Sequence, residues 1–336
     1  MSFGKWFCAL SAGLALSSIP TYAQPHGPSP NWTRSSQPDP PPVRSAHAMA
    51  YDAAHAQVVL FGGIRDTRRL ADTWLWDGIR WASASPSISP SARVGHAMAY
   101  DAASEQVVLF GGSAGSVLSD TWVWNGNNWS QQSPRHHPPA RLYPAMAYDR
   151  ATRRVILFGG YSGTEAGYLA DTWSWDGKDW IELSPRHHPA VRYAPAMAAD
   201  PTNRGLVLFG GFNFEGFLRD TWVWKGSDWI EQSPAQSPPA RNFHAMTYAA
   251  RDGLVILFGG FNYHFLSDTW QWDGANWSEQ SPAQRPTARD HVSMAYDDRS
   301  GTAVLFGGND DGNHSLGDTW CWGRPVNLGL GLSAHP

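Results

Sequence analysis

Cysteine and lysine are scarce in this chain. Of 336 residues only two are cysteine, Cys8 and Cys321, and only three are lysine, so 22 of the 25 basic residues are arginine. Covalent catalysis through a lysine amine is therefore not expected. Cys8 lies in an expected leader at residues 1–23, and its removal leaves Cys321 alone. A disulfide bond within the mature chain is thus excluded, and packing has to hold the fold together.

Long hydrophobic runs are also missing, apart from one near the N-terminus. Residues 1–23 combine Lys5, an apolar stretch from Trp6 to Ile19 and small residues ending at Ala23, which is typical of a secretory signal peptide. The stretch is too short to span a membrane comfortably, and no later run is long enough to anchor the chain. We therefore expect a secreted or periplasmic protein with no transmembrane anchor and a short linker at 24–28.

Net charge is low as well, at −4, with only 16% of residues charged. No basic footprint for a nucleic-acid partner is present, so none is expected. What the chain has in abundance is tryptophan, with 19 residues, together with 33 glycines and 25 prolines. So many Trp residues indicate a repeated unit that uses two or three of them each time.

An internal repeat accounts for this composition. Each unit has an Arg five residues before a Met, then Phe-Gly-Gly, then Asp-Thr-Trp-x-Trp, and recurs every 48 to 51 residues. The first residues of the Asp-Thr-Trp copies are Asp72, Asp120, Asp171, Asp220, Asp268 and Asp318. Spacings within the unit are constant except between Phe-Gly-Gly and Asp, where they run from 10 to 13 residues. This variable segment predicts surface loops that carry function.

Each unit reads as four short strands. Val58 to Phe61 is a continuous apolar run, suited to a strand buried on both faces, and Thr73 to Trp76 places two Trp on one face. Asp77-Gly78 and its equivalents supply hairpin turns before a third Trp. One such sheet cannot bury both faces alone, whereas six arranged radially can. The sequence therefore predicts an all-β, six-bladed propeller.

The last unit ends at Trp322 without a third Trp. Asn31-Trp32-Thr33 supplies the missing piece, because Trp32 lies 12 residues before Arg44, the spacing found after every other third Trp. A strand at 29–36 is therefore predicted to complete the last blade and close the ring. We expect a monomeric propeller at 29–323 and a tail at 324–336. Its blades are expected at 44–84, 93–132, 141–183, 192–232, 241–280 and 289–323 plus 29–36.

The combination of Phe-Gly-Gly, Asp-Thr-Trp-x-Trp and Arg-x-x-His-Ala-Met resembles the kelch repeat, and more narrowly the bacterial kelch and galactose-oxidase central-domain type. The resemblance covers about residues 29–323 and implies a six-bladed kelch propeller. Propellers of this kind include oxidases, epimerases and plain binding modules. The copper site of galactose oxidase needs a cysteine cross-linked to a tyrosine, and Cys321 matches no copper motif. No cofactor and no metal are therefore expected.

Six arginines begin the innermost strands, where we expect them to ring the mouth of the central channel. In peptide-binding kelch domains the Arg at this position can reach an acidic ligand, so the resemblance implies a ligand-binding role. A structural role is the alternative, through carbonyls or the Asp of Asp-Thr-Trp between blades. Those Asp residues are expected to cap turns through backbone N–H groups. The arginines are Arg44, Arg93, Arg141, Arg192, Arg241 and Arg289.

Residues that differ between repeats at matching positions are better functional candidates, because packing does not explain them. Asp290 and His291 form such a pair beside the Arg ring. Together with Tyr143 and Tyr193 they could supply a general base and hydroxyl partners. Only one of two adjacent strand residues can face the channel, however.

The variable loops of the third to fifth units are aromatic. We expect them to lie beside the Pro-rich crossings between blades and to form an aromatic and cationic platform suited to sugars, acidic peptides or aryl groups. The aromatic residue directly after Gly-Gly, namely Tyr161, Phe212 or Phe261, is expected to pack against its own blade. The ligand-binding candidates in these loops are Tyr168, Phe214, Phe217, Tyr263, His264 and Phe265.

Two functions from different classes remain open. The first is a non-catalytic module that binds a protein, peptide, glycan or envelope partner on the variable-loop face. The second is a carbohydrate-active enzyme, similar to the kelch-like epimerases, with its site at the channel mouth. A hydrolase is set aside for lack of a nucleophile motif. The His136-His137 and His187-His188 pairs recur in near-identical crossings, which indicates duplicated loop sequence rather than a metal site.

Overall fold

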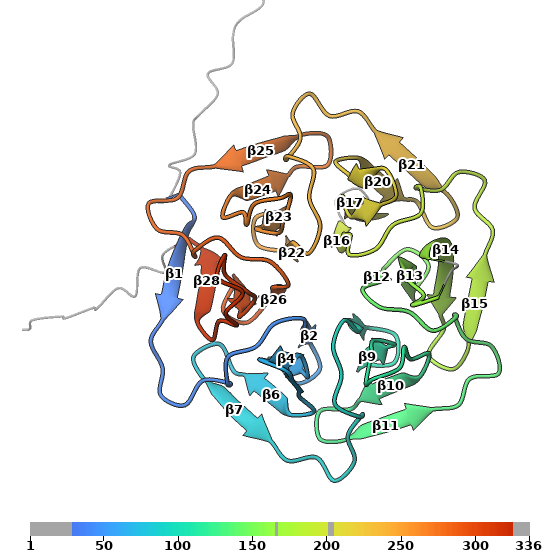
Figure 1. Ribbon diagram of the computed structural model, residues 1–336, viewed down its shortest axis with the longest axis horizontal. Helices are drawn as coiled ribbons and strands as arrows, with labels where there is room; N and C mark the ends of the chain where they lie inside the picture. Colours follow the sequence, from blue (N-terminus) through green and yellow to red (C-terminus); the bar gives the residue numbers. More distant parts are fainter. Residues whose placement is uncertain (1–28, 165–166, 201–204, 325–336) are drawn as a thin grey trace, which may run out of the picture.

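The computed structural model describes residues 29–164, 167–200 and 205–324 and forms a six-bladed β-propeller (Figure 1). Six antiparallel four-stranded sheets surround a central axis, each with one strand innermost and one at the rim. The predicted all-β architecture is confirmed. The expected leader at 1–23, the linker at 24–28 and the tail from residue 325 lie outside the described residues.

The strands of blades 1 to 5 run outward from the axis in chain order, and blade 6 has β1 as its rim strand. In blades 1 to 3 they are β2 (Ala48–Asp52), β3 (Gln57–Phe61), β6 (Thr73–Trp76) and β7 (Trp81–Ala84); β8 (Ala97–Asp101), β9 (Gln106–Phe110), β10 (Thr121–Trp124) and β11 (Trp129–Gln132); β12 (Ala145–Asp149), β13 (Arg154–Tyr161), β14 (Tyr168–Trp175) and β15 (Trp180–Leu183).

In blades 4 to 6 they are β16 (Ala196–Asp200), β17 (Gly205–Phe209), β20 (Thr221–Trp224) and β21 (Trp229–Gln232); β22 (Ala245–Ala249), β23 (Leu254–Phe258), β24 (Thr269–Trp272) and β25 (Trp277–Gln280); β26 (Ser293–Asp297), β27 (Thr302–Phe306), β28 (Thr319–Gly323) and β1 (Asn31–Ser35). Two small hairpins lie within variable loops, β4 (Ile64–Arg65) with β5 (Arg68–Arg69) and β18 (Phe212–Asn213) with β19 (Gly216–Phe217).

The hydrophobic core consists of six layers, one between each pair of neighbouring blades. The second strand of each blade lies in two of these layers, which explains its unbroken apolar run. In β3, the residues from Val58 to Phe61 have no exposed surface. An unbroken apolar run of this length therefore indicates a strand that is covered by a neighbouring blade on each side.

Two residues of the repeat join each blade to the one before it. The indole Nε1 of every third Trp donates to the hydroxyl of the Asp-Thr-Trp threonine in the preceding blade, as Trp129 does to Thr73 at 3.0 Å. The same Trp ring packs against the Phe of Phe-Gly-Gly in that preceding blade, with centroids 5.2 Å apart for Phe61 and Trp129. One Trp therefore supplies both apolar contact and a satisfied buried donor.

Phe-Gly-Gly needs both of its glycines. Gly62 and Gly63 have φ of +66° and +96°, a region that favours glycine. A Cβ atom on Gly62 would lie 2.9 Å from the carbonyl oxygen of Arg93 in the next blade, and one on Gly63 would lie 2.7 Å from that of Ser45. The motif thus marks the end of the second strand, where the chain packs closely against the backbone at Ser45 and at Arg93.

The ring is closed by the N-terminal strand, as predicted. All five residues of β1 pair with β28, from Asn31 opposite Gly323 to Ser35 opposite Thr319. Trp32 donates its indole N–H to Thr269 of blade 5 at 2.9 Å, the same bond that the other third Trp residues form. The last blade therefore contains both ends of the propeller chain, and its rim strand comes from the N-terminal side.

Candidate functional site

The variable loops and the crossings between blades share one face of the propeller, as expected. Short antiparallel bridges join the residue after each Arg to the residue after Gly-Gly, such as Ser45 with Ile64 and Val94 with Ser113. The backbone N–H of Arg93 also donates to the carbonyl of Leu70 in the variable loop of the preceding blade. We call this side the variable-loop face. Loops that are far apart in sequence thus form one continuous surface.

The six arginines do not line the channel mouth, and the expectation of a cationic ring is corrected. Each has 0% relative exposure and forms a bidentate ion pair with the Asp of Asp-Thr-Trp in its own blade, at 2.6 to 3.0 Å. The same guanidinium donates to the first glycine carbonyl of Phe-Gly-Gly, as Arg44 does to Gly62 at 2.9 Å. The N–H donors of each guanidinium are therefore bonded within the blade, which supports the structural role given above as the alternative to ligand binding. The arginines concerned are Arg44, Arg93, Arg141, Arg192, Arg241 and Arg289.

The Asp residues of Asp-Thr-Trp are structural, but not as the turn caps expected. Asp72 accepts from Arg44 and also from the indole Nε1 of Trp74, two residues later, at 2.7 Å. Burial alone would raise the pKa of Asp72, yet the hydrogen bonds and charge of Arg44 outweigh it, so this pKa lies below its usual value. Asp120, Asp220, Asp268 and Asp318 are shifted in the same direction by their arginines.

Six other residues form a ring at the axis on the variable-loop face. Each stands two positions after an Arg, and all six have φ between +48° and +65°. Around the ring, N–H groups donate to the carbonyl of the preceding member, as Gly95 does to Ala46 and Tyr143 to Gly95. We call these residues the axial ring; they are Ala46, Gly95, Tyr143, Ala194, Phe243 and His291.

The three large members of the axial ring fill its centre. Phe243 and His291 stack with centroids 3.6 Å apart, and Tyr143 packs edge-on at 4.9 Å from Phe243 and 5.6 Å from His291. Burial beside Tyr193 and Asp290 raises the pKa of Tyr143 strongly, so its hydroxyl stays protonated. A small cavity of about 100 Å³ lies directly behind these side chains. The channel is therefore closed on the variable-loop face.

Asp290 and His291 are brought together, but not in an open pocket. Nδ1 of His291 lies 2.9 Å from Oδ1 of Asp290, although the two atoms are not aligned for a hydrogen bond. His291 points to the axis and stacks on Phe243, whereas Asp290 is 7% exposed beside it. Tyr193 lies outside the ring centre and contacts Phe243 at 5.5 Å. The four candidates thus lie in or beside the packed aromatic cluster that closes the channel.

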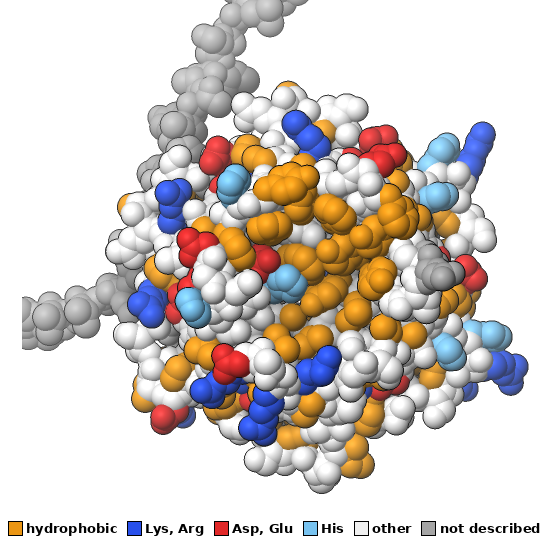
Figure 2. All heavy atoms as spheres, in the orientation of Figure 1, with side chains coloured by type: hydrophobic (Ala, Val, Ile, Leu, Met, Phe, Trp, Pro, Cys, Tyr) orange, Lys and Arg blue, Asp and Glu red, His pale blue; other side chains and the backbone are white. Residues whose placement is uncertain are grey.

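The aromatic loop residues form a continuous surface on the same face. Tyr168 stacks on Tyr193 at 5.2 Å and contacts Phe214 at 4.6 Å. Phe212 contacts Phe217, and Phe217 contacts both Phe261 and Tyr263, at 4.9 to 5.8 Å. We call this set the aromatic surface; it contains Tyr161, Tyr168, Tyr193, Phe212, Phe214, Phe217, Phe243, Phe261, Tyr263 and Phe265. Figure 2 shows apolar side chains gathered across the blades that carry β14, β20 and β24.

Exposure varies widely within the aromatic surface. Phe214 and Tyr263 are 78% and 77% exposed, and His264 beside Tyr263 is also exposed. The remaining members are half-buried. Tyr161, Phe212 and Phe261, which were expected to pack on their own blades, also contact rings of other loops, such as Phe261 with Phe217. The surface therefore has a packed base and two projecting rings.

A family model described as the KLHDC2/KLHL20/DRC7 Kelch-repeats domain matches residues 104–280, which is more than half of the chain. The chain belongs to this Kelch-repeat family. Kelch propellers generally act as protein-interaction modules. A search of the curated proteins found no match.

Sequence reasoning missed two features of this Kelch propeller's surface. Phe243 closes the channel, and the available signal was a large residue where other repeats have Ala or Gly, as at Ala46 and Gly95. The second feature is a cationic hairpin in the variable loop of blade 1, where Arg65, Arg68 and Arg69 are all exposed. The composition of that loop alone would have indicated it.

Metal ligation finds no support among the described residues, where no group of three or more His, Cys, Asp or Glu could hold an ion. His136 and His187 instead anchor crossings of the Kelch propeller, because each donates its backbone N–H to an Asp at the next hairpin, at 2.8 Å. Burial raises the pKa of Cys321 to about 11, so this thiol stays protonated. The described part of the chain contains no helix that could cross a membrane.

Proposed function

We propose that this Kelch propeller is a binding protein that docks a protein or peptide partner on its aromatic surface. The observation that carries the proposal is the exposure of Phe214 and Tyr263. Tyr263 also has a φ of +74°, a conformation that is unfavourable for a bulky residue. Backbone strain of this kind clusters at binding and catalytic sites.

Blade 2 shows that the fold does not require these aromatic residues. Its variable loop, Ser113–Ser119, has the same length as Phe261–Ser267 in blade 5. The two loops form equivalent backbone hydrogen bonds, from Leu118 to Gly112 and from Leu266 to Gly260, and equivalent bridges within the loop. Gly115 stands where blade 5 has Tyr263. One backbone therefore accepts either a polar or an aromatic sequence.

The surface favours a partner with an apolar or aromatic segment and a nearby acidic group. Contiguous exposed apolar area on a soluble protein marks an interaction site. The cationic hairpin of Arg65, Arg68 and Arg69 lies across the axial ring from blade 4 on the same face. A peptide or protein suits this pattern better than a glycan, because the aromatic surface offers few polar side chains for sugar hydroxyls. Export by the leader at 1–23 is part of the proposal, which makes the partner extracytoplasmic.

A loop graft tests the proposal. Residues 261–265 are replaced by the sequence of 113–117, so that Phe261, Tyr263, His264 and Phe265 are lost while loop length is kept. Peptides are selected on the immobilised wild-type protein from a random 12-residue library, and their affinity is measured by interferometry. We expect apolar, acidic sequences that bind the graft at least tenfold more weakly.

The reciprocal graft controls for loop conformation. Placing the sequence of 261–265 into blade 2 should leave peptide affinity unchanged, because blade 2 is not adjacent to blades 4 and 5, whose loops carry the projecting Phe214 and Tyr263. Replacing Arg65, Arg68 and Arg69 with Gln should weaken binding and reduce its dependence on salt. Selected peptides that bind the blade 5 graft as tightly as the wild type would refute the proposed site, and selective binding on a glycan array alone would refute a peptide partner.

A further inference from the structure

The central channel is a blind cavity that opens on the face opposite the variable loops. Its volume is about 410 Å³, and its walls are the innermost strands β2, β8, β12, β16, β22 and β26. One end meets the smaller cavity behind the axial ring, which closes the channel. At the other end it is lined by residues of the turns that follow these strands, including Ala53, Arg150 and Asp298. In the described part of the chain, a ligand can therefore enter the channel only from the face opposite the variable loops.

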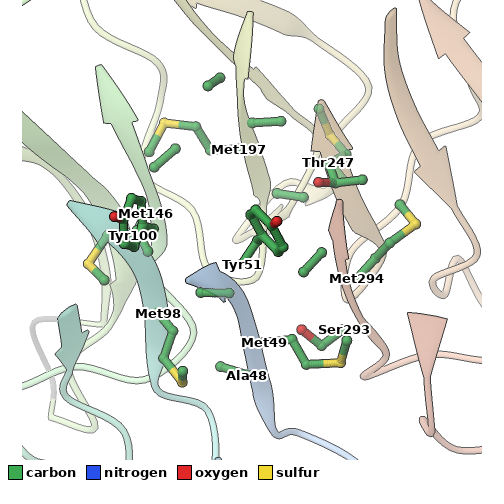
Figure 3. Close-up of a pocket in the computed structure, with 18 of the residues that line it drawn as sticks. Ala48, Met49, Tyr51, Met98, Tyr100, Met146, Met197, Thr247, Ser293 and Met294 are labelled. Carbon is green, nitrogen blue, oxygen red and sulfur yellow. The ribbon is translucent and has the colours of Figure 1, made fainter. Parts of the chain in front are cut away.

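Small side chains create the space. The first and third residues of the innermost strands are mostly alanine, with methionine between them. Blades 5 and 6 depart from this pattern, with Thr247 and Ser293 in place of alanine (Figure 3). Both line the cavity, and neither side chain has a hydrogen-bond partner among the described residues. Two neighbouring blades thus present free hydroxyl groups between the alanine and methionine side chains, in a wall that also contains His47, His96, His244 and tyrosine side chains.

Among the described residues that line the mouth, two carry charge, and their charges are opposite. Arg150 and Asp298 follow the last residue of β12 and β26, a position where Ala53, Ala102 and Ala250 stand in other blades. β12 and β26 face each other across the axis (Figure 1). Burial holds the pKa of Asp298 above its usual value, although the charge of Arg150 lowers it in part. No salt bridge joins the two residues in the described part of the chain. Their positions leave a cation and an anion on opposite sides of one cavity.

We propose that this channel binds a small zwitterionic molecule, of the size of an amino acid or dipeptide with free termini. Its carboxylate pairs with Arg150 and its ammonium group with Asp298, so that the molecule lies across the mouth. An apolar side chain then extends between the alanine and methionine residues, toward the hydroxyls of Thr247 and Ser293. A cavity of a few hundred Å³ with a few converging polar groups is the usual form of a small-molecule site. This site is independent of the partner surface, because it lies on the other face.

Titration calorimetry with the dipeptide leucyl-leucine tests the proposal. The probe is compared with its N-acetylated form, its C-terminal amide and the form blocked at both ends. We expect the free dipeptide to bind, and each block to weaken binding at least tenfold. Arg150→Gln should remove the preference for the free carboxylate, and Asp298→Asn the preference for the free amine. The double replacement Thr247→Ala with Ser293→Ala, which restores the residues of other blades, should weaken binding a few-fold.

Arg135→Gln and Asp311→Asn serve as matched controls, because both residues are exposed and neither lines the channel. They should leave dipeptide affinity unchanged, as should the blade 5 loop graft. Equal affinity for the free and doubly blocked dipeptides would overturn the zwitterion proposal, as would unchanged affinity in the Arg150→Gln and Asp298→Asn double variant. Absence of binding by leucine and by all dipeptides would overturn it too, without affecting the proposed partner surface.

Discussion

At the scale of single residues, those present in every repeat serve the scaffold and those that differ carry the candidate sites. Arg93, Asp120 and Trp122 form one hydrogen-bonded group that recurs in all six blades. Sequence reasoning left a ligand role open for the arginines, because the direction of a long side chain in a crossing cannot be read from spacing. The aspartate that pairs with each arginine lies 27 to 30 residues later in the sequence, and only the folded blade brings the two side chains together.

Removing one member of this group should destabilise the whole domain. In Asp120→Ala, the guanidinium of Arg93 stays buried without its counter-charge, and Trp122 loses its acceptor. Breaking a buried pair in this way costs roughly 3 to 5 kcal/mol. Urea denaturation at neutral pH measures the loss, with the exposed Asp311→Asn as the control. A cost below about 1 kcal/mol would contradict a structural role, since exposed ion pairs contribute no more than that.

At the scale of strands and loops, the regular elements could be predicted and the loop conformations could not. Apolar runs and Trp spacing indicated β3 and β6, because strands buried on both faces leave a continuous pattern. The axial ring left no pattern of this kind in the sequence. Tyr143 and Phe243 adopt a left-handed conformation that favours glycine, so their residue types do not indicate their backbone conformation. The sequence therefore indicated which loops are aromatic, but not that the channel is closed beneath them.

Three histidines occupy the segments that lead into innermost strands. His47, His96 and His244 are each 6% exposed, and their ring nitrogens form no hydrogen bond. Each ring packs edge-on against the Phe of Phe-Gly-Gly in the preceding blade, as His96 does against Phe61 at 5.6 Å. Burial, with a contribution from Arg93, lowers the pKa of His96 to about 3, and His47 and His244 shift in the same direction. These segments are therefore stable only with neutral histidines.

Acid should destabilise the protein through these three residues before it affects the carboxylates. The unfolded chain takes up protons below pH 6.5, whereas folded His96 stays neutral down to about pH 3. Stability therefore falls as pH decreases through this window, by up to about 1.4 kcal/mol per pH unit for each histidine. The arginine-paired aspartates contribute only below about pH 4, where the unfolded carboxyl groups begin to bind protons.

His96→Val tests this pH dependence, because blade 6 already has Val292 at the matching position. The free energy of unfolding is measured in urea between pH 7.5 and 4.5. We expect the variant to lose about 2.7 kcal/mol less than the wild type over this range, from the removal of one titrating group. Parallel curves for the two proteins would show that the buried histidine does not cause the acid sensitivity.

At the scale of the whole molecule, six equivalent layers are stable only if the ring is complete. Each blade has an apolar surface on both sides, so the first and last blades must meet. The layer between blades 5 and 6 contains Trp32 of β1 together with Trp322 of β28. The closing strand could be predicted because one Trp-to-Arg spacing recurs at the N-terminus. Which atoms hold it followed only from the structure, where Trp32 donates to Thr269.

Covalent closure should therefore stabilise the entire propeller. Thr33 of β1 lies directly opposite Cys321 of β28 in the antiparallel register. Residues paired in this way have Cα atoms about 4.5 to 5.5 Å apart, within the range for a disulfide bond. Thr33→Cys should form a bond with the natural Cys321 under oxidising conditions, visible by mass spectrometry. Because the bond joins nearly the two ends of the ring, we expect it to raise stability by roughly 2 to 4 kcal/mol.

Arg34→Cys is the matched control for this closure. Arg34 lies opposite Trp320, so its side chain is on the other face of the strand from that of Thr33. A cysteine there cannot reach Cys321 while β1 keeps its register, and oxidation should leave stability unchanged. If Arg34→Cys formed the bond instead, β1 would be shifted by one residue, and Trp32 could not occupy the layer between blades 5 and 6. If neither variant formed it, the last blade would not be closed by β1 in solution.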